Sequence, residues 1–123
     1  MNYLAIDYGT KNIGLAVSIM GIITPIPAIK NDDNVIENIQ KIIADYKIDG
    51  LYVGVSEGKF ADITKVFVDK LRLVLKLNIE TVEEAVSTIE AQQIYIQNKN
   101  KKKDYKKLID SVAAAVILRR IVD

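Results

Sequence analysis

The sequence predicts one α/β domain built on a mixed sheet, and three observations support this class. Five short apolar segments have the pattern of strands, and the first three follow one another with only turn residues between them. Helical periodicity begins after these three segments and then alternates with the other two. The 123 residues are 50% hydrophobic and 27% charged, which is typical of a globular protein. We therefore expect residues 1–123 to form a single domain.

The first third of the chain is expected to form an antiparallel meander. Strands are predicted at 3–8, 13–18 and 22–29, because each is a short apolar run between turn residues. Pro25 and Pro27 lie in the third strand and cannot donate a backbone hydrogen bond. They favour a place at the edge of the sheet.

Helices and further strands are expected after the meander. Apolar residues three or four apart predict helices at 35–46, 62–77 and 87–96 and in a last apolar segment that ends near Val122. Asp33 is a candidate N-cap of the first helix. Strands are predicted at 50–55 and 79–82. A strand, a helix and another strand in this order imply a right-handed parallel crossover, so the later strands should be parallel.

Composition excludes several classes of function. The formal net charge of +1 indicates neither nucleic acid nor membrane as a partner. The chain has no cysteine and no histidine, which excludes thiol nucleophiles, Cys-based zinc sites and every mechanism built on imidazole. It has no signal-like N-terminus and no apolar run near the roughly 18 residues of a membrane span. We expect a cytoplasmic protein with no membrane partner.

Three acidic residues differ from the solvated majority. Asp7 follows a run of apolar strand residues, where an uncompensated carboxylate is costly. Glu84 comes just after the strand at 79–82, and Asp110 lies near the start of the final helix, in LIDSVAAAVIL. The carboxyl ends of neighbouring parallel strands lie side by side. A final helix docked across that end would bring the three carboxylates together.

Such a carboxylate set suits a hard cation such as Mg²⁺ or Mn²⁺. The charge of the ion would also offset the cost of burying Asp7. Two ions about 3.5 to 4 Å apart can activate water and stabilise the leaving oxygen in phosphodiester hydrolysis.

Each acid also has an ordinary interpretation. Asp7 before Gly-Thr has the pattern of a turn cap. Glu84 has that of a loop residue, and Glu83 could take its role. An acid in a first helical turn, as expected for Asp110, is favoured by the helix dipole without any function.

A lysine-rich segment, NKNKKKDYKK, precedes Asp110. A solvated loop is its ordinary interpretation. These lysines would also steer a polyanion toward that end of the sheet and contact its phosphates without reading the sequence. The candidate nucleic-acid-binding residues are Lys11 in the first turn and Lys99, Lys101, Lys102, Lys103, Lys106 and Lys107.

Four segments resemble, in order and spacing, the YqgF family, which is also called RuvX-like. They are IDYGTKNIGLAVS, LYVGV, EEAVSTIEA and DSVAAAVIL, so the resemblance runs nearly end to end. Members of this family are described as Holliday junction resolvases and pre-16S rRNA nucleases. The resemblance implies an RNase H-like fold, with a mixed five-stranded sheet and helices on both faces.

The resemblance also implies an activity and its residues. The expected activity is metal-dependent cleavage of structured nucleic acid, such as pre-16S rRNA or branched DNA, by a monomer or homodimer. The family's three catalytic acids fall on Asp7, Glu84 and Asp110. Asp7 is expected to bridge two Mg²⁺ or Mn²⁺ ions, and the other two acids are expected to complete the coordination.

Two departures from the family pattern favour an alternative function. Ala85 stands where the family usually has an arginine that would touch phosphate or orient the glutamate. After Val55 only Ser56-Glu57-Gly58 remains of a longer family loop, and Glu57 is a candidate substitute acid. The alternative is an RNase H-like module that binds nucleic acid and cuts weakly or not at all. A third reading, an ATPase or sugar-kinase-like domain, rests on the Asp-x-Gly-Thr motif, but such enzymes close two domains over ATP.

Overall fold

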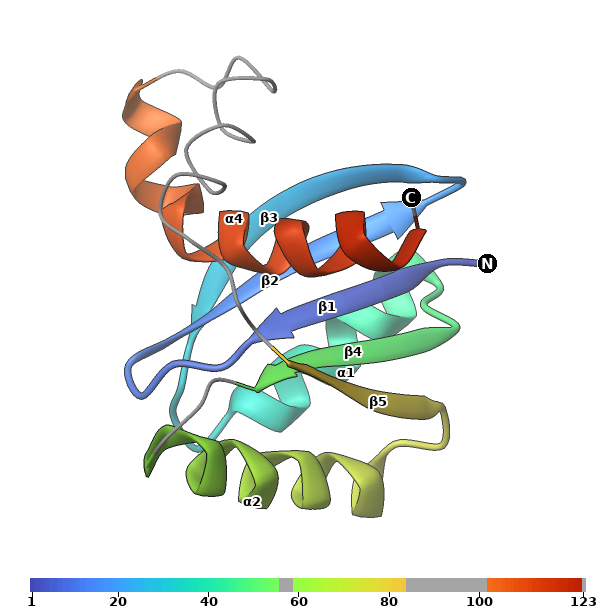
Figure 1. Cartoon of the computed structure of the whole chain (residues 1–123), viewed down its shortest axis with the longest axis vertical. Coiled ribbons are helices and arrows are strands. Elements are labelled where there is room, and N and C mark those ends of the chain that lie inside the picture. The colour runs from blue at the N-terminus through green and yellow to red at the C-terminus, as the bar shows by residue number, and fades with distance from the viewer. Residues whose placement is uncertain (56–58, 84–101, 123) are drawn as a thin grey trace.

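The computed structural model describes residues 1–55, 59–83 and 102–122. In this part of the chain, one five-stranded sheet has the order β3-β2-β1-β4-β5 (Figure 1). Its strands are β1 (Tyr3–Asp7), β2 (Asn12–Ile19), β3 (Ile22–Lys30), β4 (Gly50–Val55) and β5 (Asn78–Glu83). β2 pairs antiparallel with β1 and β3, whereas β4 pairs parallel with β1 and β5. The predicted mixed sheet is confirmed.

A two-residue turn joins β2 to β3. Met20 and Gly21 have φ angles of 53° and 83°. Positive φ at both positions is the geometry of a type I′ turn, whose twist matches that of a tight hairpin. β3 lies at one edge of the sheet, as Pro25 and Pro27 predict.

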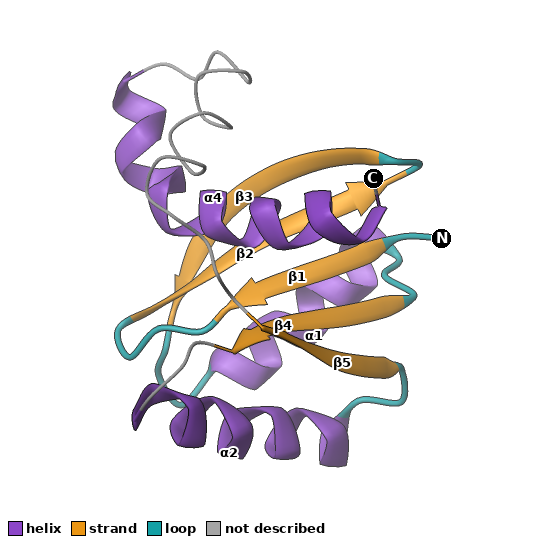
Figure 2. Cartoon of the chain, viewed as in Figure 1, coloured by secondary structure: helices purple, strands orange, loops and turns teal. Residues whose placement is uncertain are grey.

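Helices cover both faces of the sheet. They are α1 (Val35–Tyr46), α2 (Lys59–Val74) and α4 (Lys102–Val122). α1 and α2 pack on one face and α4 crosses the other (Figure 2). The helix predicted at 87–96 lies outside the described residues.

The N-cap of α1 and the limits of α2 differ from the prediction. Asn34 is the N-cap of α1, not Asp33. The Asn34 N–H donates to Asp32 Oδ1 at 2.9 Å, in a turn just before the helix, which begins at Val35 as predicted. α2 begins and ends three residues before the predicted range 62–77. It ends early because Asn78 already pairs with Gly50 in the sheet.

The start of α4 also differs from the prediction. The lysine-rich segment was expected to precede the final helix, but the helix already begins at Lys102. Lysine is a good helix former, so charge alone does not make this stretch a loop.

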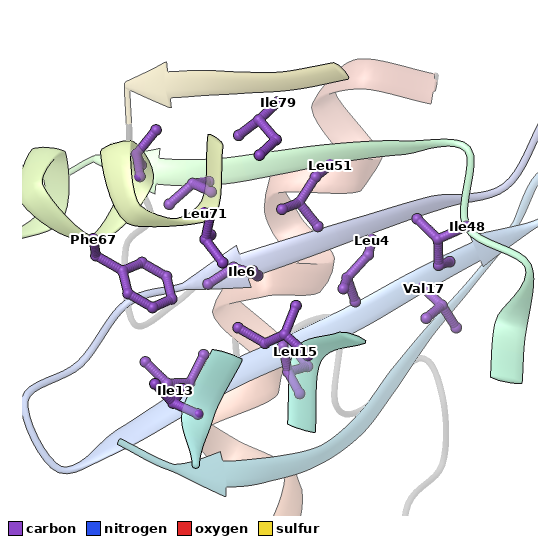
Figure 3. Close-up of a cluster of buried hydrophobic side chains, with 14 of the residues drawn as sticks. Leu4, Ile6, Ile13, Leu15, Val17, Ile48, Leu51, Phe67, Leu71 and Ile79 are labelled. Carbon is purple, nitrogen blue, oxygen red and sulfur yellow. The ribbon is translucent and has the colours of Figure 1, made fainter. Parts of the chain in front are cut away.

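The two faces of the sheet carry different cores. On the α1 and α2 side, large aliphatic side chains of the strands pack against the helices, among them Leu4, Ile6, Ile13, Leu15 and Leu51 (Figure 3). Phe67 and Leu71 of α2 belong to the same cluster. On the α4 side the sheet presents small residues, Ala5 and Ala16, to the helix residues Val112, Ala114 and Ala115. Small side chains on both surfaces let α4 lie close to the strands.

Candidate metal and nucleic-acid site

Asp7 is half-buried at the carboxyl end of β1. Side chains alternate along a strand, so Asp7 shares the α4 face of the sheet with Ala5. Its cross-strand partners are Gly14 in β2 and Gly54 in β4. Neither partner carries a side chain. The two residues opposite Asp7 in the sheet therefore place no side chain beside its carboxylate.

The turn that follows Asp7 is held by hydrogen bonds from Asn31 to two of its backbone carbonyls. Asn31, just after β3, donates its Nδ2 to the Gly9 carbonyl at 2.8 Å. The Asn31 N–H donates to the Lys11 carbonyl at 2.9 Å. A side chain at Gly9 would collide with the backbone oxygen of Asn12, so only glycine fits there. Lys11 is consequently an exposed cation on a turn whose backbone is fixed.

The carboxyl ends of three parallel strands lie together beside Asp7 (Figure 1). Asp7, Gly54 and Val82 form one row across β1, β4 and β5. Neighbouring strands are about 4.8 Å apart, so the backbones of Asp7 and Val82 are about 10 Å apart. Glu83 ends β5 one step beyond this row. Glu84, the predicted second acid, follows Glu83 and lies outside the described residues.

α4 is tied to this face one residue after Asp110. The Leu15 N–H donates to Ser111 Oγ at 3.1 Å, in a buried contact. Leu15 directly follows Gly14, which is the partner of Asp7. The backbone of Asp110 therefore lies near Leu15 and Gly14, in the part of the sheet next to Asp7. The side chain of Asp110 lies outside what the structure describes.

The sequence predicts that Asp110 lies in the first turn of the last helix, but the structure places it further along. α4 begins at Lys102, so Asp110 lies roughly two turns further on. The effect of the helix dipole on an acid falls off within the first turn. The ordinary interpretation of Asp110 as a dipole-favoured residue is therefore wrong.

The predicted basic residues fall into three groups. Lys11 lies in the first turn. Four others lie in the first two turns of α4, namely Lys102, Lys103, Lys106 and Lys107. The third group, Lys99 and Lys101, lies outside the described residues. Glu57 and Ala85, the two departures from the family pattern, also lie outside them.

Sequence reasoning missed two residues at this site, Gly54 and Ser111. Gly54 interrupts the apolar strand between Val53 and Val55, and a glycine inside a strand often marks a close approach to the backbone. Ser111 is a single hydroxyl in front of the apolar run VAAAVIL. Both signals were present, but their meaning depends on which strand and which helix lie opposite.

Tyr52 lies on the same face of β4 and is partly buried. Its ring meets the ring of Tyr3 edge-on, with centroids 5.5 Å apart. Burial raises the pKa of the Tyr52 phenol, and the charges of Glu80 and Tyr3 raise it further. Tyr52 is therefore a neutral member of this face.

The donor chemistry of the site fits a hard divalent cation. Asp7 offers carboxylate oxygens at a half-buried strand end, and the sequence contains no histidine or cysteine that would favour a softer metal. Among the side chains that the structure describes, which do not include those of Glu83 and Asp110, no three acidic groups gather into a cluster that could hold an ion. Within 1–55, 59–83 and 102–122, no helix is long and apolar enough to cross a membrane.

Solved structures share this arrangement of strands and helices. A fowlpox virus resolvase in complex with Holliday junction DNA matches with a TM-score of 0.66 at 16% identity, over 99% of this chain and 97% of that one. T. thermophilus RuvC in complex with a Holliday junction substrate matches with a TM-score of 0.63 at 12% identity, over 98% and 96%. These likenesses establish the RNase H-like fold. The chain is therefore a protein of the RNase H-like fold class, with an acid at the end of its first strand.

The family within this class follows from the sequence comparison. A family model described as "RuvX: Holliday junction resolvase" matches residues 1–123. A relative from Sulfurihydrogenibium sp. (strain YO3AOP1), named "Putative pre-16S rRNA nuclease", is 37% identical over 130 residues, which cover 98% of this chain and 88% of the relative. The chain belongs to the RuvX family, also called YqgF, and the predicted family is confirmed.

Proposed function

We propose that this protein is a divalent-metal-dependent nuclease that hydrolyses phosphodiester bonds in structured nucleic acid. The observation that carries the proposal is the position of Asp7, a half-buried carboxylate between Gly14 and Gly54 on the face crossed by α4. Neither glycine carries a side chain, so the residues opposite Asp7 in the sheet leave space for an ion beside its carboxylate. Membership of a resolvase family supports the reaction class.

Asp7, Glu84 and Asp110 are the proposed catalytic residues and metal ligands. These three carboxylates together would hold the divalent ions. Mg²⁺ or Mn²⁺, when bound, would supply the charge that activates water and stabilises the leaving oxygen. The protein's own part is to hold the carboxylates ionised and fixed. The nearness of the Asp110 backbone to the Asp7 row supports this assignment.

Lysines in the turn after Asp7 and around the start of α4 are proposed to hold the phosphate backbone. Lys11 is exposed on the fixed turn after Asp7. The first turns of α4 carry Lys102, Lys103, Lys106 and Lys107, and Lys99 and Lys101 precede them in sequence. Contacts of this kind give affinity without sequence specificity. Such binding suits a substrate that is recognised by its shape.

The proposed physiological substrate is pre-16S rRNA, cleaved during maturation of its 5′ end, with four-way DNA junctions as the second candidate. The name of the Sulfurihydrogenibium relative supports the first. The family description and the two resolvases solved with junction DNA support the second. Residues 1–123 would act as one domain, as a monomer or homodimer in the cytoplasm.

A second candidate function is an RNase H-like module that binds nucleic acid without efficient cleavage. Ala85, in place of the family's arginine, is the observation that favours it. The two candidates share a binding surface and differ only in turnover. One assay with separate binding and cleavage readouts therefore distinguishes them.

The test uses the full chain with precursor rRNA fragments, single-stranded RNA and four-way DNA junctions, each with Mg²⁺ and with Mn²⁺. Wild type is compared with Asp7→Asn and with Asp45→Asn, a control on the exposed side of α1. We expect cleavage by wild type and Asp45→Asn and loss of cleavage, with binding kept, in Asp7→Asn. Cleavage that survives Asp7→Asn would overturn the mechanism. Binding without cleavage by wild type would establish the second candidate.

A further inference from the structure

We propose that Ser111 is a positioning residue that fixes Asp110 relative to Asp7. This inference rests on the proposed function, in which the two acids share a metal site. Ser111 is fully buried in α4, and its Oγ accepts the hydrogen bond from the Leu15 N–H at 3.1 Å. Asp110 directly precedes Ser111, and Gly14, the partner of Asp7, directly precedes Leu15. A short path of bonds and contacts thus connects the two acids.

The contact falls where the strand pairing is irregular. β2 and β3 shift register between Ile13 and Leu15. A buried backbone N–H that finds no partner costs free energy, and here a hydroxyl from the helix is that partner. The bond joins residues 96 positions apart in the chain. It is therefore a specific tertiary contact and not part of a local turn.

Much of the described contact between α4 and the sheet is an apolar cluster with little directional character. Small residues contribute to this cluster, including Ala5, Ala16, Ala114 and Ala115. Apolar attraction is non-directional, so such surfaces hold a helix against a sheet without fixing its exact register. A hydrogen bond requires a defined distance and angle between its atoms.

This contact matters because a catalytic acid such as Asp110 must be positioned to within about 1 Å. A slip of α4 by one residue moves Asp110 about 1.5 Å along the helix axis. Displacements of about 1 Å are enough to reduce catalysis severely. The Ser111 hydroxyl makes a directional contact, one residue from Asp110, that ties α4 to the strand beside Asp7. Its loss should loosen the site without unfolding the protein.

The experiment measures Mn²⁺ binding by electron paramagnetic resonance of the free ion, and cleavage in parallel, on the full chain. Ser111→Ala removes the acceptor, whereas Ser111→Cys keeps a side chain of similar size with a weaker acceptor. Ile117→Val is the matched control, because Ile117 is buried in the same helix and its change removes packing without touching the Ser111 contact. The binding readout does not depend on turnover.

We expect Ser111→Ala to bind Mn²⁺ about 10- to 100-fold more weakly than wild type, as is typical when a group that orients metal ligands is lost. The half-activating Mn²⁺ concentration should rise in proportion. Ser111→Cys should lie between, and Ile117→Val should match wild type. If Ser111→Ala does not fold, Ser111→Cys decides the comparison.

Three results would overturn the proposal. They are wild-type Mn²⁺ affinity in Ser111→Ala, an equal loss of affinity in Ile117→Val, and no Mn²⁺ binding by wild type. A wild type that binds Mn²⁺ but cleaves none of the substrates would contradict the proposed function alone. In that case the affinities of the variants still decide the role of Ser111.

Discussion

Gly54 lies directly opposite Asp7 where β4 pairs with β1. Side chains on residues opposite one another in a sheet have Cβ atoms about 5 Å apart, so a methyl group at position 54 would stand against the carboxylate. We expect Gly54→Ala to reduce the single-turnover cleavage rate by about tenfold or more, since a displacement of about 1 Å in the site has effects of that order. The melting temperature should stay the same or rise, because glycine is unfavourable inside a strand.

Val53→Ala is the comparison variant, and it should lower stability while leaving the cleavage rate unchanged. Val53 is fully buried on the other face of β4, and its truncation leaves a cavity that lowers stability. The cleavage rate per folded molecule should not change. If Gly54→Ala instead loses stability and keeps its rate, Gly54 serves packing and not the site.

Neutralising Asp7 should not destabilise the metal-free protein. Acids that share a site repel one another, and removal of one charge relieves that repulsion. We therefore expect Asp7→Asn to have a free energy of unfolding equal to or above that of wild type without divalent metal, measured by chemical denaturation. The added stability that Mn²⁺ gives to wild type should disappear in this variant.

Asp49→Ala serves as the structural comparison. The Asp49 carboxylate accepts a hydrogen bond from the Asn2 N–H at 2.7 Å, so its loss should lower the free energy of unfolding whether metal is present or not. A clear loss of stability in metal-free Asp7→Asn would identify Asp7 as a turn cap and remove it from the metal site.

Lys11→Ala should weaken nucleic-acid binding in a salt-dependent manner. A lysine that neutralises one phosphate contributes about one unit to the slope of log affinity against log salt concentration. Binding titrations at several salt concentrations should show a slope smaller by about that amount, with similar losses for RNA and DNA. Lys41→Ala, which changes an exposed lysine of α1 on the opposite face, should leave the slope unchanged. Equal slopes for wild type and Lys11→Ala would exclude a phosphate contact.

Tyr52 should make stability fall at alkaline pH. Its pKa in the folded protein is raised above the ordinary value of 10.0, chiefly by burial, so the fold favours the neutral phenol. This contribution is fully present below about pH 10 and is lost as the pH rises through the raised pKa. Tyr52→Phe should reduce the alkaline loss in denaturation curves, and Glu80→Gln should lower the pKa of Tyr52 in a spectrophotometric titration. A Tyr52→Phe curve parallel to that of wild type would contradict the assignment.

Most of the sheet could be predicted because its signals are local or follow from chain direction. The strand at 50–55 and the helix at 35–46 have the predicted limits. The right-handed crossover rule predicts parallel strands, and β4 indeed lies beside β1. The N-cap of α1 was not predicted, because it depends on a single contact, in which the Asp32 carboxylate accepts a hydrogen bond from the Asn34 N–H.

The site itself could be predicted only in part. Asp7 stands out because a carboxylate in an apolar strand is unusual in any fold. Gly54 gains its meaning only from the register of β1 with β4, and Ser111 only from a contact with Leu15 far away in the chain. Neither the register nor this contact is encoded in a local pattern. The interpretation of Asp110 as a first-turn residue failed because nothing local distinguishes a lysine-rich loop from the lysine-rich start of a helix.

The prolines of β3 also affect how molecules of this protein meet one another. An edge strand with free N–H groups can pair with a strand of another chain and begin an aggregate. Pro25 and Pro27 have no N–H to offer, so they interrupt any continuous ladder that a second molecule could build on β3. The sheet is therefore closed to growth on that side, and strand addition between copies, in storage or at high concentration, would have to begin at β5.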